Sequence, residues 1–170
     1  MVTQITAGRV YDYSHCIGRG GITGIGFQDI NGIAVGSEDR VYVLNRGGEN
    51  IASVPWNKTG RGTRVGIFSL GQNPGDEEFI KEFGRYGDAD GEFRWPAGIA
   101  LDDQERVYIS DEFLNIIIMF DSEGNYLQSW NGLKPDGSTL QGPCGIAIND
   151  SQQIFVVESS ADKISKFTLE

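Results

Sequence analysis

A short motif that occurs three times constrains this chain more than any other feature of its sequence. The motif is Gly-Ile-Ala followed by a larger aliphatic residue, and it stands at 32–35, 98–101 and 145–148. A second apolar stretch begins nine residues after each glycine. A polar residue stands thirteen positions after each glycine, and these residues are Asn45, Asp111 and Glu158. Agreement at the same offsets in all copies indicates one structural unit repeated three times.

Each unit contains stretches with the composition of β-strands, and no stretch has the periodicity of a helix. In the middle unit the first strand carries the glycine motif, the next two are apolar, and the fourth begins with an aromatic residue. The predicted strands of this unit are Gly98–Leu101, Arg106–Ser110, Asn115–Phe120 and Tyr126–Trp130. The run from Ile116 to Phe120 is apolar at every position. Such a run is typical of a strand in a sheet that is covered on both faces.

The same pattern predicts the organisation of the whole chain as one domain over residues 1–170. A lone strand at about 9–18 precedes units at about 27–84, 93–131 and 140–170, and a loop is inserted into the first unit at about 46–63. The remaining strands are predicted at Gly32–Val35, Arg40–Leu44, Arg64–Ser69, Phe79–Phe83, Gly145–Ile148, Gln153–Val157 and Lys163–Phe167. Four antiparallel strands in a repeat of about 45 residues are typical of a β-propeller blade. The prediction is therefore an all-β fold with three four-stranded blades.

The middle unit reads GEFRWPAGIALD at 91–102, RVYISD at 106–111 and IIMFD at 117–121, and continues through Gly124 and Trp130. In this pattern it resembles the NHL-repeat family of β-propellers, and the third and first units resemble that family more loosely. The resemblance implies a propeller of NHL type. Members of this family usually carry six blades on one chain, whereas this chain provides three.

Three blades are too few for a closed ring, because closed propellers have about 4–8 blades. A two-fold dimer, the commonest symmetric oligomer, would supply six. In such a homodimer we expect the N-terminal strand of one chain to complete the third blade of the other. The residues expected to pair are Tyr13, His15, Ile17, Ile164 and Phe167. The alternatives are that the chain is a fragment, or one half that needs a different partner.

Composition excludes several classes of function. The net charge is −10, which disfavours nucleic acid and anionic lipid as partners. No apolar run approaches the roughly 18 residues of a membrane span, and the N-terminus does not resemble a signal peptide, so the default expectation is a cytoplasmic protein. The chain has two cysteines and one histidine, His15, which are too few for a disulfide scaffold and make zinc an unexpected cofactor.

Candidate site residues follow from the antiparallel order of the strands. The start of each first strand and the end of each second strand lie at the same edge, near the axis of a propeller. The ligand-binding rim predicted from this placement consists of Asn31, Asn45, Arg46, Trp95, Asp111, Glu112, Cys144 and Glu158. In a dimer Asp111 and Glu158 would contribute four carboxylates to one opening. Oxygen ligands alone favour Ca²⁺ or Mg²⁺ over zinc, although hydrogen bonding of strand ends would equally account for these residues.

Three functions remain open at the level of sequence. The first is a binding module that takes a small molecule or a protein partner on the rim. The second is a lyase or hydrolase that uses an acidic, metal-bound channel. The third is a protein–protein scaffold that uses the inserted loop at about 46–63. The repeat predicts the fold but does not choose among these functions.

Overall fold

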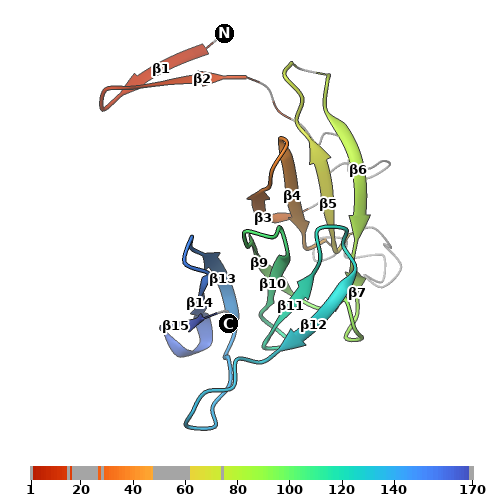
Figure 1. Cartoon of the computed structure of the whole chain (residues 1–170), viewed down its shortest axis with the longest axis vertical. Coiled ribbons are helices and arrows are strands. Elements are labelled where there is room, and N and C mark those ends of the chain that lie inside the picture. Colours follow the sequence, from red (N-terminus) through yellow and green to blue (C-terminus); the bar gives the residue numbers. More distant parts are fainter. Residues whose placement is uncertain are drawn as a thin grey trace, which may run out of the picture.

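The computed structural model describes residues 2–14, 16, 27, 29–47, 62–73 and 75–168. Within these residues the chain is all-β, with fifteen strands and one single-turn 3₁₀ helix, η2 (Ser159–Ala161). Figure 1 shows three sheets that follow one another in chain order, with a two-stranded hairpin set apart from them. None of the helical structure in the described part of the chain is long and apolar enough to cross a membrane.

The three main sheets coincide with the three sequence repeats. The first sheet has the order β3 (Ile30–Val35), β4 (Arg40–Asn45), β5 (Arg64–Ser69) and β6 (Glu78–Phe83). The second has the order β9 (Pro96–Leu101), β10 (Val107–Asp111), β11 (Ile116–Phe120) and β12 (Tyr126–Trp130). The third contains only β13 (Pro143–Ile148), β14 (Gln153–Glu158) and β15 (Lys163–Thr168). All neighbours are antiparallel, which confirms the strands predicted for each unit, and we refer to the sheets as blades 1, 2 and 3.

Polar side chains form the tight turns between adjacent strands. Asp102 Oδ1 accepts the backbone N–H groups of Gln104 and Arg106, 3.0 and 2.9 Å away. Asp121 and Asn149 accept two backbone N–H groups each in the same way, from residues two and four positions later. Asp and Asn favour turns because a short side chain can satisfy these backbone donors. The turn residues therefore fix the register of the blades locally.

Blade 2 is buried on both of its faces, as its apolar third strand predicts. Alternate residues of β11 point in opposite directions, because successive side chains of a strand do so. Ile118 and Phe120 join the core shared with blade 1, and Ile117 and Met119 join the core shared with blade 3. The first strand of blade 2, β9, contacts both β3 and β13. The three first strands therefore lie side by side at one edge of the molecule.

The N-terminal residues differ from the prediction of one lone strand. β1 (Val2–Thr6) pairs with β2 (Arg9–Tyr13) as an antiparallel hairpin, in which Tyr13 lies opposite Val2. Ala7 and Gly8 both have positive φ, 48° and 73°, and such turns match the twist of a hairpin. The predicted strand thus starts at Arg9 and ends at Tyr13, while His15 and Ile17 lie outside the described residues. Most of the inserted loop at 46–63 also lies outside them.

Candidate functional site

The second strand of every blade ends with the same backbone hydrogen bond. The N–H group of the residue after the strand donates to the carbonyl oxygen of a residue that precedes the first strand of that blade. The three bonds are Arg46 to Asp29 at 3.0 Å, Glu112 to Trp95 at 3.0 Å and Ser159 to Gly142 at 2.9 Å. The repeat therefore brings the predicted rim residues to one edge of each blade.

Asp111 ends the second strand of blade 2, and its carboxylate is fully hydrogen-bonded to backbone. Oδ2 accepts the N–H groups of Arg94 and Trp95, 2.7 and 2.9 Å away. Oδ1 accepts those of Phe113 and Leu114, 3.1 and 2.9 Å away. The side chain is completely buried, and hydrogen bonds to an ionised acceptor are stronger than neutral ones. Asp111 thus fixes the loop before β9 to the turn after β10.

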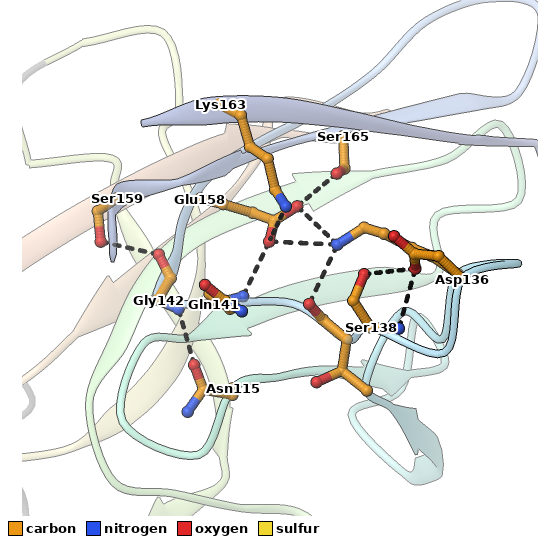
Figure 2. Close-up of polar contacts among 11 residues, drawn as sticks. Asn115, Asp136, Ser138, Gln141, Gly142, Glu158, Ser159, Lys163 and Ser165 are labelled. Carbon is orange, nitrogen blue, oxygen red and sulfur yellow. Dashed lines mark hydrogen bonds and ion pairs between the residues drawn. The ribbon is translucent and has the colours of Figure 1, made fainter. Parts of the chain in front are cut away.

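Glu158 occupies the equivalent position of blade 3 and is also completely buried, but its partners are mostly side chains (Figure 2). Lys134 Nζ donates to Oε1 at 2.9 Å, and Ser165 donates to the same oxygen. Oε2 accepts the Gln141 N–H at 2.9 Å and lies 3.8 Å from Lys163 Nζ. Burial alone would raise the pKa of Glu158, but hydrogen bonds from Ser165, Lys134 and Gln141 outweigh it and hold the pKa below its ordinary value.

These two networks do not support the cation site predicted at Asp111 and Glu158. Each carboxylate is buried and already accepts several donors. Asn45, the third member of the predicted ring, is buried and donates its Nδ2 to the Val43 carbonyl oxygen at 3.1 Å. No group of three or more His, Cys, Asp or Glu side chains suited to a metal occurs among the described residues. The alternative of hydrogen-bonded strand ends describes these positions better.

Three other predicted rim residues make contacts across or within the blades. Asn31 Nδ2 donates to the Pro96 carbonyl oxygen at 3.3 Å, which joins blade 1 to blade 2. Glu112 Oε1 accepts the Ser159 hydroxyl at 2.9 Å and so links blade 2 to blade 3. Cys144 is half-buried as a free thiol, and its carbonyl oxygen accepts the Ser110 hydroxyl at 2.5 Å. These hydrogen bonds connect blade 1 to blade 2 and blade 2 to blade 3.

Trp95 and Arg46, predicted as separate rim residues, lie against each other. The guanidinium carbon of Arg46 is 3.9 Å from the centroid of the Trp95 ring system. A cation over an aromatic face is attracted by the ring quadrupole, by about 0.5–1 kcal/mol at an exposed site. Trp95 remains 40% exposed. The contact joins the end of β4 to the residue before β9 and leaves much of a large ring in solvent.

A second group of aromatic and cationic side chains surrounds Arg94, the residue before Trp95 in the sequence. Arg94 donates through Nη1 to the Tyr86 hydroxyl at 2.9 Å and through Nη2 to Asp88 Oδ2 at 2.7 Å. Its guanidinium carbon is 5.2 Å from the Tyr86 ring centroid and 5.8 Å from that of Phe113. Phe113 is 61% exposed. We call Arg46, Tyr86, Arg94, Trp95 and Phe113 the rim cluster.

The loop before β9 holds Arg94 in place. In this loop β7 (Arg85–Tyr86) pairs in parallel with β8 (Glu92–Phe93). Glu92 accepts Arg85 Nε at 2.6 Å and the Ala89 N–H at 3.1 Å, which lower its pKa. The local feature of the sequence here is the acidic run at 88–92, and such a run is typical of a solvated connection. Parallel pairing over two residues has no pattern that sequence reasoning could have detected.

The residues predicted to pair between two chains are placed in different environments. Tyr13 is in the exposed hairpin, and His15 and Ile17 lie outside the described residues. Phe167 of β15 packs inside the molecule, with its ring centroid 4.9 Å from that of Trp130. Ile164, on the opposite face of β15, is exposed. Within the described residues β15 has one neighbouring strand, β14.

Comparison with known proteins identifies the class of fold. No protein-family model matches the chain, and no curated protein matches it. Among solved structures, one from a nidogen/laminin complex matches with a TM-score of 0.52 and 20% identity over 85% of this chain. A gluconolactonase from Xanthomonas campestris matches with a TM-score of 0.49 and 17% identity over 78% of this chain. A catalytically inactive virginiamycin B lyase from Staphylococcus aureus, solved with quinupristin, matches with a TM-score of 0.49 and 15% identity over 84% of this chain.

The structure from the nidogen/laminin complex is a β-propeller, and together with the antiparallel sheets it supports a propeller fold for this chain. Identities of this size show the fold alone. This chain spans 45% of the matched chain of the nidogen/laminin structure, 36% of the gluconolactonase and 42% of the lyase. The chain therefore aligns with less than half of each matched chain.

Proposed function

We propose that this chain is a binding module of the β-propeller class and that its ligand binds at the rim cluster. The observation that carries the proposal is the exposure of Trp95 and Phe113 beside Arg46 and Arg94. Exposed aromatic residues together with arginine are enriched where proteins recognise partners. The chain as a whole is acidic, with a net charge of −10, and each of these two aromatic rings nonetheless lies beside a guanidinium group.

The chemistry of the rim cluster defines the class of ligand. Arg46 covers one part of the Trp95 ring and leaves another part open, which suits stacking of a planar apolar group. A guanidinium group recognises carboxylates through a planar fork of donors. We therefore infer a ligand, or a segment of a protein partner, that carries a planar apolar group next to a carboxylate. One of the matched structures comes from a complex between two proteins, nidogen and laminin.

We further propose that the blades are of NHL type and that two chains close a ring of six blades. Support for the NHL type comes from the pattern at 91–102 and 106–111, which forms β9 and β10. Support for the ring comes from the third blade, which has three strands within the described residues where the other blades have four. The rim cluster comes from blades 1 and 2 of one chain and does not depend on this closure.

The binding function can be tested with a library of small aromatic carboxylic acids and their neutral amides. Ligand-observed NMR would rank the acids, and the dissociation constants of the best binders would be measured by titration. We expect Trp95→Ala and Arg46→Gln each to weaken binding of the acids by about tenfold or more, which corresponds to one stacking or charge-assisted contact. Tyr11→Ala on the exposed hairpin is the matched control. Equal affinity of the wild type and Trp95→Ala for every acid would contradict the proposal.

A further inference from the structure

The two interfaces between blades repeat one contact. At the first, a Cβ atom on Gly32 of β3 would lie 2.9 Å from Ile99 Cγ2 of β9. At the second, a Cβ atom on Gly98 of β9 would lie 3.2 Å from Ile146 Cγ2 of β13 and would also clash with the Cys144 carbonyl oxygen. At each interface the isoleucine of the following blade covers the glycine of the preceding blade. Glycine is needed at such a close approach between strands.

The third copy of the motif has the same residues without the contact. Gly145 of β13 is exposed, and a Cβ atom there would meet only Val157 of its own blade, at 3.2 and 3.6 Å. Ile33 of β3, equivalent to Ile99 and Ile146, is 63% exposed. The described residues therefore contain one glycine that no isoleucine covers and one isoleucine that covers no glycine.

The residues around Gly145 extend this open surface over blade 3. Val157 of β14 is 40% exposed and Ile164 of β15 is 68% exposed. Their equivalents in blades 1 and 2 are completely buried under the following blade, and these are Leu44, Ser110, Val65 and Ile117. Burying an aliphatic side chain removes apolar surface from water and so stabilises a protein. The exposed surface of blade 3 therefore corresponds to the surface that the following blade covers in blades 1 and 2.

β3 of blade 1 exposes the other half of the repeated contact. Ile30 and Val35 are exposed along with Ile33, whereas the equivalent side chains of the other first strands are buried or half-buried, namely Pro96, Leu101, Pro143 and Ile148. In the neighbouring strand β4, Val41 and Val43 are buried against Phe68. The Phe68 ring packs on Phe27, with 4.8 Å between the ring centroids. Among the described residues of β3 and β4, the exposed aliphatic side chains are therefore all on β3.

We propose that the open face of blade 3 docks against β3 of a second copy of this chain, with Ile33 of the second copy over Gly145. A second copy fits because it presents the missing half of a contact that occurs twice within the chain. Each copy carries both halves, so two copies related by a two-fold axis form two identical contacts and close the ring. This inference rests on the six-bladed closure proposed above and specifies the residues that make it.

The test uses the whole chain and two variants on exposed residues, Ile33→Asp and Ile164→Asp, with Leu127→Asp on the outer strand β12 as the matched control. Light scattering coupled to size exclusion should give twice 18.6 kDa for the wild type and the control. Each of the two variants should give 18.6 kDa. A mixture of the two variants should recover a dimer. Ile33→Asp keeps an unaltered blade 3 and Ile164→Asp keeps an unaltered β3, so one of the two interfaces in the mixed dimer is intact. Circular dichroism would check that each variant keeps its strands.

Three results would overturn the inference. The first is a wild-type mass of 18.6 kDa at about 100 μM, as expected if further blades of a longer polypeptide cover this face. The second is a dimer that neither variant weakens, and the third is a mixture of variants that stays monomeric. Binding of aromatic acids to the monomeric variants would be unchanged if the proposed function holds, because the rim cluster lies in blades 1 and 2. Failure of the docking and failure of the binding function are therefore distinguished.

Discussion

Blades 2 and 3 carry the same repeat but differ in what surrounds it. Gly98 of blade 2 is enclosed by the following blade, whereas Gly145 of blade 3 faces solvent. The polar residues that end their second strands differ as well. Asp111 holds four backbone N–H groups, while Glu158 holds one and reaches two lysines and a serine. The repeat therefore sets where the motif glycine and the polar residue at the end of the second strand lie. The neighbouring chain segments determine what these two residues contact.

Adding a side chain to the motif glycine of blade 2 and to that of blade 3 should produce the largest difference between these blades. Gly98→Val places methyl groups against the Cys144 carbonyl oxygen and the Ser110 hydroxyl. We expect a loss of about 3 kcal/mol or more in the free energy of unfolding, because the obstacle is backbone that cannot move aside. Gly145→Val meets only the Val157 side chain and should cost under about 1 kcal/mol. Urea unfolding at low protein concentration would measure both, and equal losses would refute the difference between the blades.

Removal of the Asp111 carboxylate is expected to have the next largest effect. Asp111→Ala leaves the N–H groups of residues 94, 95, 113 and 114 without their acceptor. A loss of about 3 kcal/mol in the free energy of unfolding follows from several charge-assisted hydrogen bonds and partly buried donors. Asp136→Ala is the control, since exposed Asp136 accepts the N–H group and the hydroxyl of Ser138, and its removal should have a much smaller effect because solvent can replace these bonds. A similar effect of both variants would mean that Asp111 does not fix the rim loops.

Glu158→Gln keeps the size of the side chain and removes the charge that faces Lys134 and Lys163. We expect it to destabilise the chain by about 2 kcal/mol at pH 7, because Lys134 loses its carboxylate partner. The pKa of Glu158 is lowered by folding, so its contribution is complete above the unfolded value of about 4.3 and disappears as pH falls through the lower folded value. Unfolding from pH 7 to pH 2 should therefore show the two proteins converging in acid. A constant difference would contradict the role of the charge.

The smallest loss of stability is expected at a solvent-exposed ion pair between blades 1 and 2. Lys81 of β6 pairs with Glu123 in the turn before β12 at 3.0 Å, and their side chains are 35% and 65% exposed. Lys81→Ala should change the free energy of unfolding by under about 0.5 kcal/mol, because exposed ion pairs are screened and mobile. A double-mutant cycle with Glu123→Ala would measure the coupling. A coupling above about 1 kcal/mol would show that outer contacts, and not only inner strands, hold adjacent blades together.

The strands of the three blades could be predicted because their signal is repeated and local. Apolar runs such as Ile116–Phe120 and the motif glycines each indicate a strand from the residues of that strand alone. β1 was missed because Val2–Thr6 belongs to no repeat, and its partner strand was expected to pair with another chain. A hairpin turn built by Ala7 and Gly8 is a weak signal compared with a three-fold repeat.

The sequence places Asp111 and Glu158 at the ends of the second strands, but it does not reveal what these carboxylates contact. Asp111 and Glu158 were expected to line a shared opening in a dimer, and within this chain both are buried among hydrogen-bond donors. Backbone N–H groups leave no trace in a sequence, so the four partners of Asp111 were invisible. Lys134, the main partner of Glu158, comes from a loop more than twenty residues earlier, and nothing in the repeat locates it. The contact between Arg46 and Trp95 also depends on how two blades pack.

Asp111 has a consequence for how the specificity of this surface could change. It holds residues 94, 95, 113 and 114 through their main-chain N–H groups, and any amino acid other than proline provides such a group. The shape of the two loops is therefore separated from the identity of the side chains that they present. A library randomised at Arg94, Trp95 and Phe113 would keep one backbone while it varied charge, size and aromaticity. The rim of this chain is thus a scaffold on which new recognition surfaces can be selected without redesign of the fold.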